Sequence, residues 1–517
     1  MLYRSTRGKA QNYTFEDAVI TGLAPDGGLF IPHEIPALPP NYLNEWKDLS
    51  FTELSLKIIS LFVDDSEIPS QDLKSIIEAS YSTFTSKDVT PLVQIDKTKD
   101  LWILELFHGP TFAFKDVALQ FLGNLFEYFL NRRNKQRKSE SEPLHKLTIV
   151  GATSGDTGGA AIYGLKGKKN ISVYILHPNN RVSTIQRAQM TTVEDENIHN
   201  IAIEGTFDNC QDIVKELFGR EDFRSKHSLG AINSINWARI LAQIVYYFHS
   251  YFTLARKNKT SPKVVFFTPT GNFGDILAGH YAAKLGLPIL KLVVATNSNN
   301  ILDRFFKTGS YQKDGYGVLE TPSPAMDILV SSNFERFLWY LARDYETHST
   351  SDLHDRELEA GQIISKWMDD LKTKGSIKVS DESLKHARSA FSSGSTDDKT
   401  TYEVIRRYYS TKTDENHTQY LLDPHTAVGV SVYERLYSQL VEELGIPEFT
   451  SICLSTAHPS KFIEAVDLSL EGIEPKFDHK TILPQQFVGI LELKQRYTVL
   501  QNSADAVAQF IEARETL

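Results

Sequence analysis

From about residue 101 onward, short apolar runs alternate with longer amphipathic segments along the chain. The apolar runs share a strand-like length, and they cover residues 101–107, 147–150, 173–176, 264–267 and 290–295. Runs of this length are typical of buried strands, and the segments between them have the length and apolar spacing of helices. The alternation therefore predicts an α/β fold with parallel sheets whose faces are covered by helices.

The pattern of the first 90 residues is different. Residues 23–32 place Pro, Asp and Gly, which favour turns, in front of a short apolar strand. Helical patterns follow around residues 54–63 and 73–81. A polar run at residues 131–143 holds five cations and two carboxylates. This run predicts a solvated loop after a helix, with a docking patch for a partner as the alternative.

Beyond about residue 330 the pattern is mostly helical. A helix is expected over residues 352–374, a second polar loop near 392–399, and a further helix from about Pro424. No internal repeat and no long linker interrupts the chain, so we expect closely packed domains. The expected units are an N-terminal domain over 1–90, a core over 91–470 with a small substrate-side subdomain at about 105–230, and a C-terminal extension over 471–517 that packs on the core.

Composition and charge narrow the class of protein. The 517 residues are 41% hydrophobic and 23% charged, which is typical of a soluble globular protein of several domains. A net charge of −10 argues against nucleic acid or an anionic membrane as the main partner. No apolar run approaches the ~20 residues that span a bilayer, and no signal peptide opens the chain, so we expect a cytoplasmic protein. The two cysteines, Cys210 and Cys453, form no metal-binding array, and we expect reduced thiols and no metal.

Lys115 lies in the first of three motifs at predicted strand ends. The segment HGPTFAFKD, residues 108–116, follows an apolar strand and leads into an amphipathic helix. Aromatic neighbours exclude water from Lys115, and desolvation lowers the pKa of an ammonium, as a Schiff-base lysine requires. The alternative is an ordinary surface lysine at a helix start, which this motif alone does not exclude.

The second and third motifs are turns rich in small residues. GATSGDTGG, residues 151–159, follows the predicted strand at 147–150, and TPTGNFGD, residues 268–275, follows the strand at 264–267. Such turns let backbone N–H groups at a helix N-terminus bind an anion. Neither turn matches GxGxxG or the GK[ST] ending of a nucleotide-binding loop, which disfavours dinucleotides and nucleoside triphosphates. Each turn is equally compatible with small residues chosen for packing alone.

Together these motifs resemble those of a known family. Residues 105–119 are similar to the lysine attachment segment of fold-type II pyridoxal-phosphate (PLP) enzymes, the group of the tryptophan synthase β-subunit. With Ser5-Thr6-Arg7 and residues 22–32, the motifs resemble the long threonine synthases of fungi and many bacteria. The resemblance implies two open, mostly parallel sheets covered by helices, with an N-terminal domain and helical C-terminal additions. It also implies conversion of O-phosphohomoserine and water to threonine and phosphate, the last step of threonine biosynthesis.

The resemblance assigns roles residue by residue. Lys115 would form the Schiff base with PLP and later move protons at the substrate. The cofactor phosphate would be bound by Gly271, Asn272, Phe273, Gly274 and Asp275. The substrate's carboxylate or phosphate would be held by Ser154, Gly155, Asp156 and Thr157. Many relatives carry Asn in place of Asp156, which leaves the partner of this side chain open.

Thr456, in the segment LSTAHP at residues 454–459, resembles the hydroxyl that faces the pyridine nitrogen of PLP. A hydroxyl does not enforce protonation of that nitrogen, so the ring is expected to be a weaker electron sink than beside a carboxylate. Thr456 is also a candidate helix N-cap before Pro459. His108 and His458 are expected to be structural, and residues 297–299 are weaker candidates for the same site.

Two other classes of function stay open at this point. One is another fold-type II enzyme, such as a serine or threonine dehydratase, which the N-terminal segment and HGPTFAFKD disfavour. The other is a catalytically silent relative that binds PLP or an amino-phosphate ligand, which the intact Lys115 and both turns disfavour. The expected partner is a small-molecule substrate, and no obligate protein partner is evident.

Overall fold

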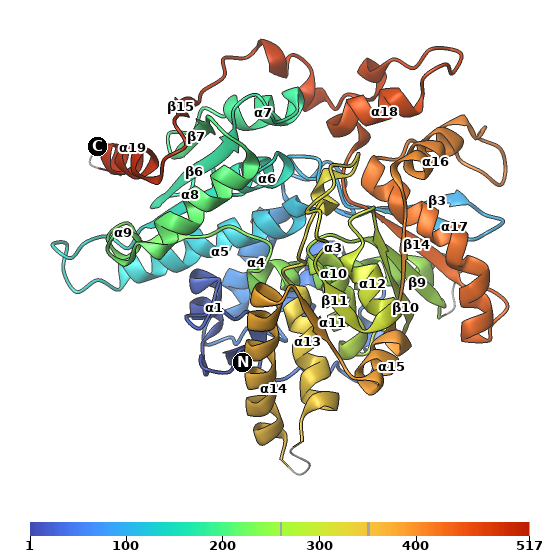
Figure 1. Ribbon diagram of the computed structural model, residues 1–517, viewed down its shortest axis with the longest axis horizontal. Helices are drawn as coiled ribbons and strands as arrows, with labels where there is room; N and C mark the ends of the chain where they lie inside the picture. Colours follow the sequence, from blue (N-terminus) through green and yellow to red (C-terminus); the bar gives the residue numbers. More distant parts are fainter. Residues whose placement is uncertain (259–260, 349–351, 516–517) are drawn as a thin grey trace.

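Two open sheets form the framework of the computed structural model, which describes residues 1–258, 261–348 and 352–515 (Figure 1). The larger sheet has six strands in the order β13-β10-β9-β14-β4-β3. Only β3 runs antiparallel to its neighbour, and the other pairs are parallel. Its strands are β3 (Leu92–Asp96), β4 (Leu101–Glu105), β9 (Val264–Pro269), β10 (Ile289–Thr296), β13 (Phe391–Ser395) and β14 (Thr450–Ser455).

The smaller sheet has five strands in the order β15-β7-β6-β5-β8, and all its pairs are parallel. Its strands are β5 (Leu147–Ala152), β6 (Ile171–Pro178), β7 (Ile198–Ile203), β8 (Leu229–Gly230) and β15 (Thr498–Leu500). The five strands expected from the apolar runs are present as β4, β5, β6, β9 and β10. The predicted α/β fold with two open, mostly parallel sheets is therefore confirmed.

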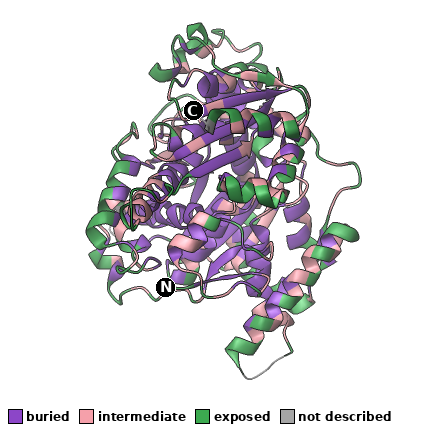
Figure 2. Ribbon diagram, turned by 90° about the vertical axis from the view of Figure 1, so that its left-hand side faces the viewer, coloured by how far each residue is buried: buried purple, intermediate pink, exposed green. Residues whose placement is uncertain are grey.

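Helices cover the sheets, so that the strands lie buried in the middle of the molecule and the outer helix faces are exposed (Figure 2). The helices that accompany the larger sheet are α10 (Trp237–Asn258), α11 (Gly274–Leu285), α12 (Ile301–Thr308), α13 (Phe334–Leu341), α15 (Asp381–Ala390), α16 (Asp398–Ser410) and α17 (Pro424–Leu444). Those beside the smaller sheet are α6 (Asp156–Leu165), α7 (Thr184–Thr191), α8 (Phe207–Gly219), α9 (Glu221–Lys226) and α19 (Ala504–Glu515). The expected helices at 352–374 and from Pro424 are α14 (Leu353–Thr373) and α17.

The long helix α5 (Lys115–Lys135) joins the two halves, because it packs against α4, α6 and α10. Gly123 of α5 and Gly164 of α6 make this packing close: a Cβ built on Gly123 would lie 1.9 Å from the Gly164 carbonyl oxygen. Each glycine lies eight residues into its helix, about 12 Å from the helix start. The side chains of the first residues of these two helices also meet, because Lys115 Nζ lies 3.5 Å from Asp156 Oδ2.

The N-terminal segment packs against α5 and α10. It contains β1 (Tyr3–Ser5), α1 (Phe15–Thr21), β2 (Phe30–Pro32), α2 (Tyr42–Glu45), α3 (Phe51–Ile59) and α4 (Ser70–Tyr81). Part of the predicted polar loop at 131–143 is wrong, because α5 continues to Lys135. Arg132 and Arg133 in this last turn pair with Glu16 of α1, so two of the five cations of the run dock the N-terminal segment.

The second predicted polar loop, at 392–399, is also wrong. Residues 391–395 form β13, the edge strand of the larger sheet, and α16 starts at Asp398. Serine and glycine carry little strand signal of their own. The strand exists because it pairs with β10, because Phe391 is buried, and because the Ser393 hydroxyl donates to the Asp303 carboxylate at 2.8 Å.

The C-terminal segment runs from the larger half of the molecule back to the smaller half, as the red ribbon in Figure 1 shows. It passes through η3 (Pro459–Phe462), α18 (Ile463–Ser469), η4 (His479–Ile482), η5 (Gln485–Phe487) and η6 (Ile490–Glu492) before β15 and α19. Phe487 packs on Phe112, with ring centroids 5.0 Å apart, in a small apolar cluster with Ala188 and Ile490. The segment thus contacts the loop that precedes Lys115.

Shorter elements complete the larger half. They are η1 (Pro324–Met326), the antiparallel pair β11 (Ser310–Gln312) and β12 (Ser376–Lys378), and the π-helical turn η2 (Ala342–Glu346). Cys210 and Cys453 are free and buried. None of the helices within the described residues is long and apolar enough to cross a membrane.

Candidate active site

Three strand ends of the larger sheet meet at one edge. The parallel register places Ser455 of β14 opposite Glu105 of β4, and Cys453 of β14 opposite Phe267 of β9. The loops that follow β4, β9 and β14 therefore emerge side by side, where parallel α/β sheets bind their ligands. Backbone hydrogen bonds join two of these loops, because the Phe114 N–H donates to the Thr456 carbonyl at 2.8 Å.

Lys115 is the first residue of α5, and the turn in front of it is locked. Asp116 accepts hydrogen bonds from the Thr111 backbone N–H at 2.7 Å and from the Thr111 hydroxyl at 2.6 Å. The Lys115 side chain is buried, and burial lowers its pKa, although the nearby Asp156 carboxylate opposes this shift. A buried lysine with a lowered pKa is the form that a carbonyl-binding amine needs.

Asp156, from the smaller sheet's side, faces this lysine. It is the first residue of α6, and its Oδ2 lies 3.5 Å from Lys115 Nζ. Its Oδ1 accepts from Lys461 Nζ at 2.6 Å and from the Gln186 amide at 3.0 Å. Burial alone would raise the pKa of Asp156, but Lys461 and Lys115 hold it well below its usual range. The site therefore contains an ionised carboxylate between the side chains of two buried lysines.

The turn after β9 is held by hydrogen bonds from the segment that precedes α13. The Ser331 hydroxyl donates to the Gly271 carbonyl at 2.7 Å, and the Asn333 N–H donates to the Asn272 carbonyl at 3.0 Å. Phe273 adopts a left-handed conformation with φ of 60°, and its ring is buried against Phe334. The turn is thereby fixed at the N-terminus of α11, where backbone N–H groups favour an anion.

The carboxylate of Asp275, in the first turn of α11, points into the protein. It accepts hydrogen bonds from the hydroxyls of Tyr246 and Tyr247, both of α10. Burial raises the pKa of Asp275 to about 7, against the effect of the two tyrosines. Its side chain therefore braces the turn from behind, and the backbone of the turn is what remains for an anion.

Arg239, in the first turn of α10, is buried near Lys115 and near Tyr246, one of the two tyrosines that hold Asp275. Its charge acts on Lys115 and on Tyr246. Its Nε and Nη1 atoms are buried and have no hydrogen-bond partner within the described residues. Burial lowers the pKa of this guanidinium to about 10. An unpaired buried cation is costly, so this site fits an anionic group that neutralises it.

Comparisons with known proteins show to which family the chain belongs. Residues 2–81 match the model of the threonine synthase N terminus, residues 85–357 that of pyridoxal-phosphate-dependent enzymes, and residues 426–511 that of the threonine synthase C-terminal region. The threonine synthase of Saccharomyces cerevisiae is 51% identical over 97% of this chain and 95% of that protein. The chain belongs to the threonine synthase family.

Solved structures of the threonine synthase family agree with the fold. The crystal structure of the yeast enzyme has a TM-score of 0.92 at 50% identity and covers 100% of this chain and 99% of its own. The PLP-bound structure from Brucella melitensis has a TM-score of 0.85 at 39% identity, with coverage of 100% and 99%. The present chain is likewise a PLP-dependent enzyme, and the buried Lys115, the fixed turn before α11 and the unpaired Arg239 fit that cofactor.

Three residues of the site were not predicted from the sequence: Gln186, Arg239 and Lys461. Lys461 is buried beside Asp156 and follows the LSTAHP segment by two positions. The sequence offers only a weak signal for it, namely a lysine directly after a strand end that already carries Thr456. Gln186 and Arg239 lie inside ordinary helical patterns and carry no such signal.

The other candidate residues, His108, His458, Asn297 and Asn299, contact polar groups of neighbouring residues. His108 Nε2 lies 2.7 Å from the Glu105 carboxylate, and His458 Nδ1 lies 2.7 Å from the Ser460 hydroxyl. The N-cap role suggested for Thr456 is wrong, because His458 caps η3 with its own side chain. Asn297 and Asn299 belong to a separate network, in which their amides donate to the Asp327 carboxylate at 2.7 and 3.0 Å.

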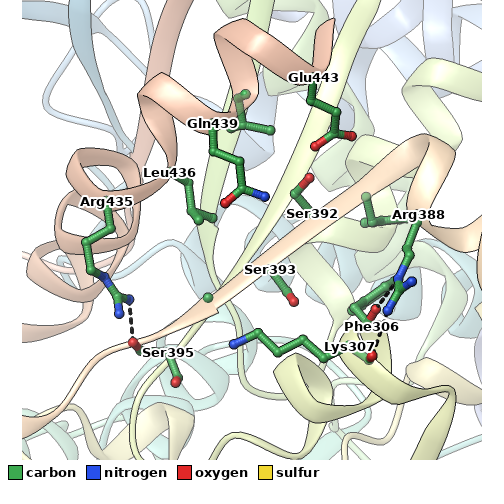
Figure 3. Close-up of a pocket in the computed structure, with 13 residues that line it drawn as sticks. Phe306, Lys307, Arg388, Ser392, Ser393, Ser395, Arg435, Leu436, Gln439 and Glu443 are labelled. Carbon is green, nitrogen blue, oxygen red and sulfur yellow. Dashed lines mark hydrogen bonds between the residues drawn. The ribbon is translucent and has the colours of Figure 1, made fainter.

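A cavity of about 520 Å³ lies away from this site, between β13 and α17 (Figure 3). Its charged side chains already have partners: Arg388 donates to the Phe306 carbonyl, Arg435 to the Ser395 carbonyl, and Glu443 pairs with Lys291. A smaller cavity of about 340 Å³ reaches Lys461 from the side of α7 and the C-terminal segment. The second cavity therefore adjoins the candidate active site, and the first does not.

Proposed function

We propose that the residues between the two sheets convert O-phosphohomoserine and water into L-threonine and phosphate, with Lys115 as the amine that binds PLP. One observation carries this proposal: a buried lysine at the start of α5 faces an ionised carboxylate at the start of α6, on the side of the smaller sheet. Membership of the threonine synthase family indicates the substrate. Catalysis by a neutral amine requires the lowered pKa that burial gives Lys115.

The proposed cofactor contacts follow the geometry. The turn Gly271, Asn272, Phe273, Gly274 and Asp275 would hold the cofactor phosphate through backbone N–H groups at the start of α11. Arg239 would neutralise the same anion, and Thr456 would face the pyridine nitrogen. When bound, PLP supplies an electron sink for the negative charge left when the substrate loses a proton. Lys115, displaced from the cofactor, would move protons at the substrate's Cα and Cβ.

The substrate would meet the turn before α6. Ser154 is exposed, whereas Gly155 and Asp156 are buried, and Thr157 is half-buried. The Thr153 hydroxyl holds this turn, because it accepts from the N–H groups of Gly155 and Gly158. The N-terminus of α6 then favours the substrate's carboxylate or phosphate. Because Asp156 is neutralised by lysines, it does not repel that anion.

The substrate is a small molecule, and we place the enzyme in the cytoplasm with no obligate protein partner. The test is to supply the purified protein with PLP and O-phosphohomoserine and to measure phosphate and threonine. Equal amounts of both products are expected. If 2-oxobutanoate or no product forms while PLP stays bound, the proposal fails and a dehydratase or a silent relative takes its place.

A further inference from the structure

Lys461 is a buried charge that the proposed reaction does not yet use. It lies in η3, next to the end of β14, and its side chain has an exposed fraction of 0%. Its Nζ contacts Asp156 Oδ1 at 2.6 Å and donates to the Thr111 carbonyl at 2.8 Å. An ammonium is rarely buried unless a carboxylate and further hydrogen bonds compensate it. Both kinds of partner are present here.

These contacts tie Lys461 to both sides of the site. Asp156 begins α6 beside the smaller sheet, whereas Thr111 belongs to the locked turn in front of Lys115. Lys461 therefore spans the two halves at the point where Lys115 emerges.

The two oxygens of Asp156 are divided unequally between the lysines. Oδ1 receives Lys461 at 2.6 Å and Gln186 at 3.0 Å, whereas Oδ2 is 3.5 Å from Lys115. Lys461 is thus the main ion partner of Asp156, and Lys115 is the weaker one. A carboxylate without Lys461 would instead pair with Lys115 and hold it as an ammonium.

We propose that Lys461 is a positioning residue that neutralises Asp156, so that Lys115 can release its proton and act as an amine. The proton leaves Lys115 Nζ for solvent, and no other bond changes. The inference rests on the role proposed for Lys115 in binding PLP. Besides each other, the charged or titratable groups that act on Lys115 or on Asp156 are Lys461 of η3, Arg239 of α10 and His425 of α17, and Lys461 also acts on Asp116 of α5.

The test measures the pKa of Lys115 in the full-length protein freed of PLP. Competitive acylation with a radiolabelled or isotopic anhydride, read by mass spectrometry of the Lys115 peptide, gives this pKa without turnover. Lys461→Met is expected to raise the pKa of Lys115 by about one to two units, because the carboxylate then has one cation left. Asp156→Asn is expected to lower it, because two cations then face each other.

Matched variants separate charge from packing. Lys461→Arg keeps the charge and is expected to leave the pKa of Lys115 close to that of the wild type. Lys480→Met removes an exposed lysine that lines the same cavity as Lys461, and it is expected to have no effect. If Lys461→Met does not fold, Lys461→Gln removes the charge and keeps a donor for the Thr111 carbonyl, with the same expected direction.

The two variants Lys461→Met and Asp156→Asn are expected to shift the pKa of Lys115 in opposite directions. An unchanged or lowered pKa of Lys115 in Lys461→Met, or shifts of the same sign in Lys461→Met and Asp156→Asn, would overturn the inference. Because labelling needs neither substrate nor cofactor, this result is independent of whether threonine is formed. A confirmed pKa shift in a protein that forms no threonine would leave the positioning role intact and reject the proposed function.

Discussion

The two glycine-containing turns, before α6 and before α11, each carry one aspartate in the first helical turn, yet the two aspartates differ in charge. Asp156 lies between Lys115 and Lys461, which hold its pKa well below its usual range despite burial. Asp275 lies between two tyrosine hydroxyls, and burial raises its pKa to about 7. The same residue type at the same kind of helix start is thus an anion in one turn and holds its proton much more tightly in the other.

The difference shows how one fold divides two tasks. An anionic Asp156 pairs closely with Lys461 and more weakly with Lys115, so its charge is compensated within the site. A carboxyl group held by tyrosines at Asp275 leaves the positive end of α11 free for an anion such as the cofactor phosphate. The surroundings of a carboxylate, and not its position in a motif, decide its role.

The largest expected effect comes from removing Lys115, the lysine that faces the ionised Asp156. Lys115→Ala removes the proposed amine, and we expect turnover of O-phosphohomoserine to fall by a factor of roughly 10³ or more. The circular dichroism spectrum is expected to stay that of the wild type, because the turn is locked by Asp116 and Thr111. Lys480→Ala, at an exposed lysine, serves as the control and is expected to keep full activity. Substantial activity of Lys115→Ala would reject its role.

The next effect concerns Asp275, in the turn before α11. Asp275→Ala leaves the buried hydroxyl of Tyr246 without this acceptor, which costs about 1–3 kcal/mol, whereas the Tyr247 hydroxyl still donates to the Asp275 carbonyl at 3.1 Å. We therefore expect a melting temperature several degrees below that of the wild type. Asp275→Asn keeps an acceptor of the same shape and is expected to melt close to the wild type. Equal losses for both variants would show that the charge of Asp275 matters more than its hydrogen bonds.

A smaller effect compares the backbones of the two turns. A Cβ on Gly271 would lie 2.6 Å from the Ala325 carbonyl oxygen, so Gly271→Ala must displace the turn. We expect the dissociation constant for PLP, measured by titration of the apoprotein, to rise by roughly tenfold or more. Gly151→Ala is the matched control, because its Cβ would make ordinary contacts with two side chains, Ile175 at 3.6 Å and Ile232 at 4.0 Å. Similar affinities for both variants would contradict the assignment of the phosphate to the Gly271 turn.

The smallest effect is a pH dependence. The pKa of Asp275 is about 7 in the folded protein and 3.8 as its ordinary value. The folded state therefore holds this proton more tightly, and the stabilisation is complete below about pH 4 and is lost as the pH rises through about 7. The melting temperature of the wild type, relative to Asp275→Asn, is expected to fall by a few degrees between pH 5 and pH 8. A rise over this range would contradict a raised pKa.

Much of this arrangement could be predicted from the sequence, because its signals are local. The apolar runs predicted β4, β5, β6, β9 and β10, and the motif around Lys115 predicted a buried lysine at a helix start. The edge strand β13 was missed because its serines and glycine become a strand only by pairing with β10.

The remaining site residues escaped prediction because their partners are distant in the chain. Lys461 pairs with Asp156 and Thr111, more than 300 residues earlier, and nothing in its neighbours marks it as buried. The same holds for the contact between Gln186 and Asp156, which depends on how α7 packs beside α6. Local patterns predict elements and turns, whereas charge pairs across two sheets depend on the tertiary fold.

Two buried lysines, Lys115 and Lys461, lie beside Asp156, and only one of them can bind the cofactor as proposed. Reduction of the PLP-loaded protein with borohydride fixes the bond between cofactor and lysine, and peptide mapping then locates the pyridoxyl group. We predict a single modified residue, Lys115, with Lys461 unmodified. A pyridoxyl group on Lys461, or on neither lysine, would contradict the proposed division of roles between them.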